Sequence, residues 1–116
     1  MPVRDVDLIL FEVGGRKWAA DPWDVVRVDR AGGEGEASAR ALVIKYGEGE
    51  TRVPIDRLLG FQRVPAHALR PLPPFAQRLT SPAVVGAWLA ASEEIVLLLD
   101  LQALVKESVS LLLRSP

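Results

Sequence analysis

The sequence predicts a mainly β protein with one short helix at its C-terminus, and three observations lead to that prediction. Apolar and polar residues alternate on both sides of short glycine turns, as in half-buried strands. A pattern of apolar positions and a glycine turn recurs after 33 residues. Between residues 52 and 75, the chain is held extended and a continuous helix is excluded by Pro65, Pro71, Pro73 and Pro74. We interpret this stretch as a fixed connection between two β units.

Length and composition set the outer limits. With 116 residues, 49% of them hydrophobic, the chain is long enough for one compact unit and too short for two independent domains. A net charge of -1 and few aromatic residues make nucleic acid an unexpected partner. The chain has no cysteine, and its first residues, MPVRDVD, lack the apolar core of a signal peptide. Its longest apolar run, Ile95 to Leu99, is too short to cross a bilayer. We therefore expect a cytoplasmic protein without direct membrane insertion.

The first β unit is predicted at about residues 7–30. Residues 7–13 read as a strand, and Gly14 with Gly15 suits a tight hairpin turn into a return strand at residues 16–20. Asp21 and Pro22 suit the cap and the start of one helical turn, which the apolar strand residues 25–28 follow. Residues 31–40 carry three glycines and no large apolar side chain, which predicts a surface loop.

The second β unit is predicted at about residues 41–100, where the pattern of the first unit repeats without a gap at an offset of 33 residues. The matching pairs are Ile9 with Leu42, Phe11 with Ile44, Val13 with Tyr46, Gly14 with Gly47, Val25 with Leu58, Val26 with Leu59, Val28 with Phe61 and Arg30 with Arg63. The physical interpretation is two similar units, each completing the burial of the other. The alternative is a chance likeness between two amphipathic hairpins.

The chain ends in a predicted hairpin and a helix. Residues 83–90 read as a strand, residues 91–94 as a turn, and residues 95–99 as a returning strand buried on both faces. Asp100 suits the N-cap of a helix over about residues 101–114, whose apolar positions are Leu104, Val105, Val109, Leu112 and Leu113. This apolar stripe either docks on the β units or serves a partner, and a short helix needs tertiary packing to persist.

Residues suited to catalysis or metal binding are scarce. The single histidine, His67, has no second metal-ligand residue at helical spacing. Asp21, Asp24 and Asp56 each stand beside a turn signal, which favours turn and cap roles over a catalytic carboxylate pair. We expect no catalytic residue, no metal and no cofactor.

Several segments together resemble the CheW family, the adaptors that link bacterial chemoreceptors to the histidine kinase CheA. The residues 66–71, AHALRP, and the following Pro74 and Phe75 are similar to the family's small-x-x-(Ile/Leu)-Arg-Pro segment. Residues 85–104 are similar to its glycine-containing strand, apolar return strand and terminal helix. Residues 8–28 are similar to its opening strands.

The chain also departs from the family pattern. Family members carry a further segment with Gly-x-x-Asn-Leu-Arg-Gly and Pro-x-x-Asp-Leu stretches, where this chain has only the loop at 31–40. It resembles the short members that serve gliding motility in myxobacteria. Because the family fold is two fused SH3-like β-barrels, the resemblance implies one complete and one truncated barrel, with possible self-association at the edge that the missing strands leave.

The resemblance further implies a non-catalytic adaptor that binds the cytoplasmic tip of a methyl-accepting chemoreceptor within receptor clusters. Carried over residue by residue, the receptor groove involves Val25, Arg27, Val28, Leu58, Leu59 and Phe61. At the position of Arg27 the family usually has a carboxylate, which would change receptor preference. Contact with a CheA-type kinase is doubtful, because the first unit supplies much of that interface in the family. The alternative is a small β-barrel that binds an unrelated peptide or ligand.

Overall fold

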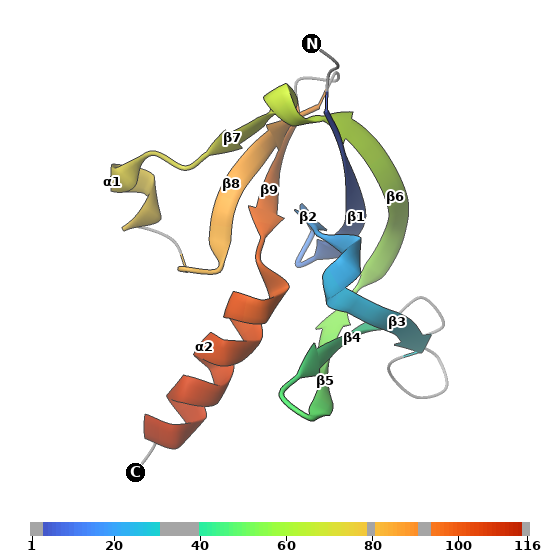
Figure 1. The fold of residues 1–116 in the computed structure, drawn as a ribbon, viewed down its shortest axis with the longest axis vertical. Coiled ribbons are helices and arrows are strands. Elements are labelled where there is room, and N and C mark those ends of the chain that lie inside the picture. Colours follow the sequence, from blue (N-terminus) through green and yellow to red (C-terminus); the bar gives the residue numbers. More distant parts are fainter. Residues whose placement is uncertain (1–3, 31–39, 79–80, 91–93, 115–116) are drawn as a thin grey trace.

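The computed structural model describes residues 4–30, 40–78, 81–90 and 94–114. These residues measure 47 × 34 × 28 Å along their principal axes and form two β-sheets with a few helical segments (Figure 1). The strands are β1 Asp5–Val13, β2 Arg16–Ala20, β3 Val25–Arg30, β4 Arg40–Tyr46, β5 Gly49–Ile55, β6 Arg57–Pro65, β7 Leu69–Pro71, β8 Val84–Leu89 and β9 Ile95–Leu99. The helical segments are η1 Pro22–Asp24, η2 Ala66–Ala68, α1 Pro74–Gln77 and α2 Leu101–Arg114.

One sheet has six strands in the order β6-β1-β2-β9-β8-β7, and the other has three in the order β3-β4-β5. Every neighbouring pair is antiparallel except β2 and β9, which run parallel. In Figure 1 the six-stranded sheet curls at one end of the molecule, and the three-stranded sheet and α2 lie toward the other end. The mainly β prediction with a C-terminal helix is confirmed. None of the described helices is both long enough and apolar enough to cross a membrane.

The predicted division into a unit at 7–30 and a unit at 41–100 does not describe the sheets. The six-stranded sheet takes β1 and β2 from the first stretch and β6 to β9 from the second. The three-stranded sheet takes β3 from the first stretch and β4 with β5 from the second. The sequence division is wrong because each hairpin pairs with the third strand of the other repeat.

The 33-residue repeat appears in the strand registers. Ile9 in β1 lies opposite Phe61 in β6, and their counterparts Leu42 in β4 and Val28 in β3 also lie opposite each other. The irregularities match as well, since the β1–β6 register skips Leu59 and the β3–β4 register skips its counterpart Val26. A chance likeness between two hairpins would not reproduce the register and bulge of a long-range pairing. The repeat is therefore real, with its third strands exchanged between the two sheets.

Local turn chemistry follows the sequence prediction. Gly14 and Gly47 both adopt φ 61°, the left-handed conformation that their hairpin turns require. Asp21 caps η1 by accepting a hydrogen bond from the backbone N–H of Trp23 at 2.9 Å, and Pro22 begins the turn. The predicted hairpins and cap are confirmed.

The stretch at 52–75 departs from the prediction in two places. The apolar run from Val53 to Phe61 is interrupted at Asp56, which accepts a hydrogen bond from the Gly14 N–H at 2.7 Å and donates its own N–H to the Glu12 carbonyl oxygen at 2.9 Å. These contacts to the β1–β2 hairpin separate β5 from β6. Pro74 also opens the short helix α1, a position that proline favours because its missing N–H would be unpaired there.

Two apolar cores hold the fold together. The first, here called the intersheet core, joins β1 and β2 to the three-stranded sheet and α2, and consists of Ile9, Phe11, Ala20, Leu42, Ile44, Ile55, Leu101 and Val105. The second, here called the barrel core, lies on the other face of the six-stranded sheet and consists of Leu8, Ala19, Val64 and Val96. The two faces of β1 thus serve different cores, as strand alternation requires.

Helix α2 docks on the protein through its first half. Leu101 and Val105 are buried, and the Gln102 side-chain amide donates to the Lys45 carbonyl oxygen in β4 at 2.9 Å. Asp100 accepts a hydrogen bond from the Ala103 N–H at 3.1 Å, as expected of an N-cap. The predicted apolar positions Val109, Leu112 and Leu113 lie outside the described side chains. The predicted loop at 31–40 lies outside the described residues except for Arg40, as does most of the predicted turn at 91–94.

The three-stranded sheet is open at both sides. In the part of the chain that the structure describes, β3 and β5 each pair on one side only, with β4. Such edges leave backbone N–H and C=O groups available to another strand. Self-association through these edges stays a prediction.

Candidate functional site

Three of the six predicted receptor positions point into the protein. Val25 and Val28 on β3 and Leu58 on β6 are half-buried and pack against the intersheet core. Val25 lies opposite Ile44, Val28 opposite Leu42, and Leu58 opposite Phe11, all of them core residues. The two repeats therefore do bring these positions to a common apolar region, but much of their surface is already used for packing.

Phe61 and Leu59 have different surroundings. Phe61 is 68% exposed, although it lies opposite the buried Ile9 in the β1–β6 pair. Leu59 is half-buried at the irregularity where the β1 register passes from Gly60 to Leu58. Phe61 is thus the predicted position with the most apolar surface available to a partner.

Arg27 lies on the opposite face of the three-stranded sheet from Val25 and Val28. It lies opposite Val43, whose neighbours in β4 both belong to the intersheet core, so strand alternation turns Val43 and Arg27 to the other face. The structure therefore does not bring Arg27 together with the apolar receptor positions.

An ion-pair network, here called the charged ladder, covers this face and consists of Arg27, Asp29, Glu50 and Arg52. Arg27 Nη1 lies 2.9 Å from Glu50 Oε2, and Arg27 Nε lies 3.2 Å from Asp29 Oδ1. The hydrogen bond to Glu50 and the charge of Asp29 raise the pKa of Arg27 above its ordinary value. Val43 lies between Arg27 and Arg52 in the register and is only 1% exposed.

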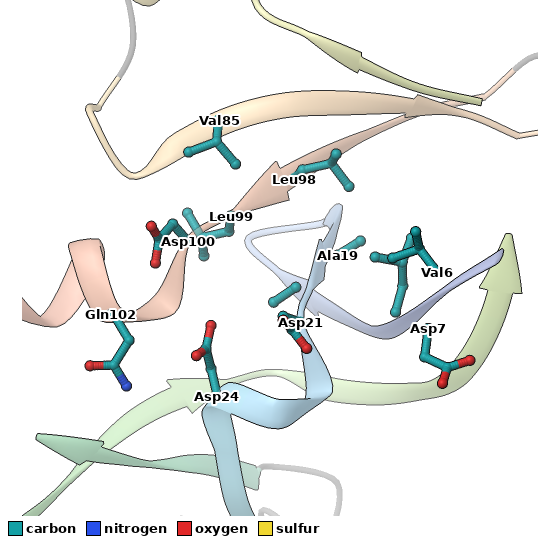
Figure 2. Close-up of a pocket in the computed structure, with 12 residues that line it drawn as sticks. Val6, Asp7, Ala19, Asp21, Asp24, Val85, Leu98, Leu99, Asp100 and Gln102 are labelled. Carbon is teal, nitrogen blue, oxygen red and sulfur yellow. The ribbon is translucent and has the colours of Figure 1, made fainter. Parts of the chain in front are cut away.

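A cavity of about 480 Å³, here called the acidic groove, lies between the six-stranded sheet, η1 and the start of α2. Figure 2 shows its lining residues. Its apolar lining includes Ala19, Ala20, Leu98 and Leu99, of which the two alanines are almost completely buried, and Val85 lies on the β8 side. None of the six predicted receptor positions lines it. The acidic groove is a separate feature of the surface.

Three carboxylates rim the acidic groove: Asp21, Asp24 and Asp100. Asp21 and Asp100 each use one oxygen to cap a helical segment. Figure 2 shows Asp24 reaching up between the other two, and its carboxylate makes no hydrogen bond or ion pair with any residue that the structure describes. Burial raises the pKa of Asp24 above its ordinary value of 3.8, and the negative charges of Asp21 and Asp100 raise it further.

Sequence reasoning assigned Asp21 and Asp24 to turn and cap roles. The cap role of Asp21 is confirmed, and Asp24 is the last residue of η1. Their meeting with Asp100 was missed, because β9 brings Asp100 beside β2 from the far end of the chain and a single sequence carries no signal for that pairing. His67 lies exposed in η2.

Comparison with known proteins shows which family the chain resembles. The CheW-like domain matches residues 24–109, from η1 into α2. The chain is 32% identical over 80 residues to the Frizzy aggregation protein FrzB of Myxococcus xanthus, covering 61% of this chain and 71% of that protein.

The solved structures give an independent match. The scaffolding protein TtCheW from Thermoanaerobacter tengcongensis superimposes with a TM-score of 0.69 over 88% of each chain, at 11% sequence identity. This likeness confirms the CheW-like fold of SH3-like barrels that the family resemblance implies. Because the family match spans most of the chain and the fold agrees, the protein belongs to the CheW-like domain family.

Proposed function

We propose that this protein is a non-catalytic adaptor of a chemotaxis-type signalling system, which binds the cytoplasmic tip of a methyl-accepting chemoreceptor. The observation that carries the proposal is the CheW-like match over residues 24–109, which includes all six predicted receptor positions. The protein would work in the cytoplasm at receptor clusters, as a scaffold without cofactor or catalytic residue. Its similarity to FrzB favours a pathway of the gliding-motility type.

The proposed receptor contact centres on Phe61. A partner helix gains most from large apolar side chains that are exposed in the free protein and buried on binding. Phe61 has that exposure, whereas Val25, Val28 and Leu58 already contact the intersheet core. Leu59, at the bulge beside Phe61, would add to the same surface.

We further propose that coupling to a CheA-type kinase is weak or absent. A stable interface needs about 800 Å² from each partner with good shape complementarity. The three-stranded sheet offers few strands, and the charged ladder covers its outer face with paired charges. Exposed ion pairs that are already satisfied give a docking partner little to gain. The protein would therefore modulate or insulate receptor clusters.

Co-sedimentation with a cytoplasmic chemoreceptor fragment tests the receptor proposal, and the chain offers a matched pair of variants. Phe61→Asp places a charge at the proposed contact, and Phe75→Asp makes the same change at a side chain of similar exposure, 70% against 68%, on α1. We expect Phe61→Asp to weaken binding at least about tenfold, the effect of losing one well-buried apolar anchor, with Phe75→Asp unchanged. Equal binding by both folded variants would remove Phe61 from the contact, and absence of binding by the unaltered protein would contradict the function.

A further inference from the structure

The acidic groove combines an apolar floor with negative charge that the protein itself leaves uncompensated. Ala19 and Ala20 at the end of β2 line the groove but are almost completely buried, so its accessible apolar surface comes from half-buried neighbours such as Val6 and Leu98. Its volume, about 480 Å³, is within the range of sites that enclose a side chain or small ligand. The groove therefore has room for an apolar stem with a polar end.

The charge on the rim of the groove determines which polar group the end of such a ligand should carry. Asp7 also lines the groove, but Arg63 pairs with it at 2.9 Å. No ion pair within the described part of the chain involves the three rim carboxylates. Three like charges around one cavity repel one another, and a cation placed among them relieves that repulsion. The electrostatic complement of the groove is a positive group.

The arrangement favours an organic cation over a metal ion. Among the described residues, no three His, Cys, Asp or Glu side chains come close enough together to hold a metal. Asp21 and Asp100 also each have one oxygen engaged in a capping hydrogen bond. A guanidinium group is planar, carries five donors and can bond several separated carboxylates, and its alkyl stem suits an apolar floor.

The rim indicates that this cation belongs to another protein. Trp23 does not line the groove, but it is 90% exposed and lies in η1 between the rim residues Asp21 and Asp24, its backbone held by the cap. Val85, on the β8 side, is 47% exposed. Exposed tryptophan beside an acidic pocket is the surface that an arginine with apolar neighbours fits, through burial and cation–π contact.

We propose that the acidic groove binds an exposed arginine of a partner protein, with its alkyl stem on Val6 and Leu98 and its guanidinium among Asp21, Asp24 and Asp100. The apolar residues that flank this arginine in the partner would contact Trp23 and Val85. The site is independent of the proposed receptor contact at Phe61, so either can be correct without the other.

Amide chemical-shift mapping of the ¹⁵N-labelled full chain tests the proposal with two short peptides, acetyl-Leu-Arg-Leu-amide and acetyl-Leu-Gln-Leu-amide. The expected result is saturable shifts at Ala19, Ala20 and Leu98 with the arginine peptide, and about tenfold weaker binding of the glutamine peptide. Absence of saturable shifts, or equal affinity for both peptides, would overturn the proposal.

Variants locate the effect in the carboxylates. In the triple variant Asp21→Asn, Asp24→Asn and Asp100→Asn, the preference for arginine is expected to disappear, while the asparagine oxygens keep both caps. Asp24→Asn alone disturbs neither cap and should weaken arginine binding. It therefore provides the test even if the triple variant does not fold. Glu48→Gln removes an equal charge at an exposed turn that does not line the groove and should leave binding unchanged. Retention of the arginine preference by the folded Asp24→Asn protein would contradict the assignment.

Discussion

Arg27 occupies in β3 the position that Gly60 occupies in β6, 33 residues further along the chain. Gly60 lies opposite Leu10 on the barrel side of the six-stranded sheet, and Arg27 lies opposite the counterpart of Leu10, Val43. Likewise Arg52 corresponds to Ala19, a member of the barrel core. The face that is barrel interior in the larger sheet is therefore a charged surface in the smaller one. Val43 nevertheless stays buried, with Arg27 and Arg52 as its neighbours in the register.

The charged ladder predicts a salt-dependent effect on stability. Arg27→Glu puts three carboxylates together with Asp29 and Glu50, so the variant should melt at a lower temperature than the unaltered protein. High salt should reduce the difference, because screening weakens repulsion between exposed charges. Arg16→Glu serves as the control, since Arg16 is exposed and forms no ion pair with a described residue. Thermal melts in low and high salt test this prediction. If the difference in melting temperature between Arg27→Glu and the unaltered protein did not change with salt, the charged ladder would not be its cause.

Docking of α2 predicts that Leu101→Ala destabilises the whole fold. Leu101 is fully buried in the intersheet core, and truncating such a leucine costs about 2–5 kcal/mol of unfolding free energy. Gln102→Ala, the next residue, loses one exposed hydrogen bond to Lys45 and should cost about 1 kcal/mol or less. Urea unfolding curves measure both. A Leu101→Ala protein as stable as the Gln102→Ala protein would mean that the helix does not support the core.

Replacing Gly86 is predicted to destabilise the protein for a steric reason. An added Cβ would stand 2.5 Å from the Arg70 carbonyl oxygen and 3.3 Å from Leu98 Cδ1, so β7 would have to move. Gly86→Ala should cost about 1–3 kcal/mol, as overpacking does, and speed hydrogen exchange of the amides paired between β7 and β8. At Gly49 an added Cβ has only a 4.0 Å neighbour, so Gly49→Ala should be tolerated. Similar stability of the two variants would contradict the close approach of β7.

Asp24 predicts that removal of its charge stabilises the folded protein in a pH-dependent way. Because its pKa is raised in the folded protein, its contribution to stability is fully present below pH 3.8 and is lost as the pH rises through the folded pKa. Asp24→Asn avoids that loss and should be more stable than the unaltered protein at neutral pH, with the difference closing below pH 3.8. Unfolding curves across this pH range test the sign. A variant that is less stable at neutral pH would show that Asp24 has a favourable partner.

Local signals in the sequence predicted most of the individual elements. Gly14 and Gly47 mark hairpin turns that require a left-handed residue. Asp21 and Asp100 mark caps, which they form through hydrogen bonds to nearby backbone N–H groups. Each of these depends on neighbours in sequence, which is why the prediction was reliable. The 33-residue repeat also predicted which residues hold equivalent places.

Long-range relationships could not be predicted in the same way. The exchange of β3 and β6 between sheets depends on pairings across the whole chain, and a repeat pattern is equally compatible with pairing inside each unit. The break at Asp56 depends on hydrogen bonds to Glu12 and Gly14 in a distant hairpin. The acidic groove depends on the parallel pairing of β2 with β9. In each case the decisive partner is remote in sequence.

Titration against two partners tests the proposed adaptor most directly: a cytoplasmic chemoreceptor fragment and the regulatory domain of a CheA-type kinase, each measured by isothermal titration calorimetry with the same protein preparation. We predict binding to the receptor fragment and no measurable binding to the kinase domain, because the three-stranded sheet has too little surface and a charge-paired face. A dissociation constant for the kinase domain in the range of about 1 μM, corresponding to about -8 kcal/mol, would contradict the uncoupled adaptor.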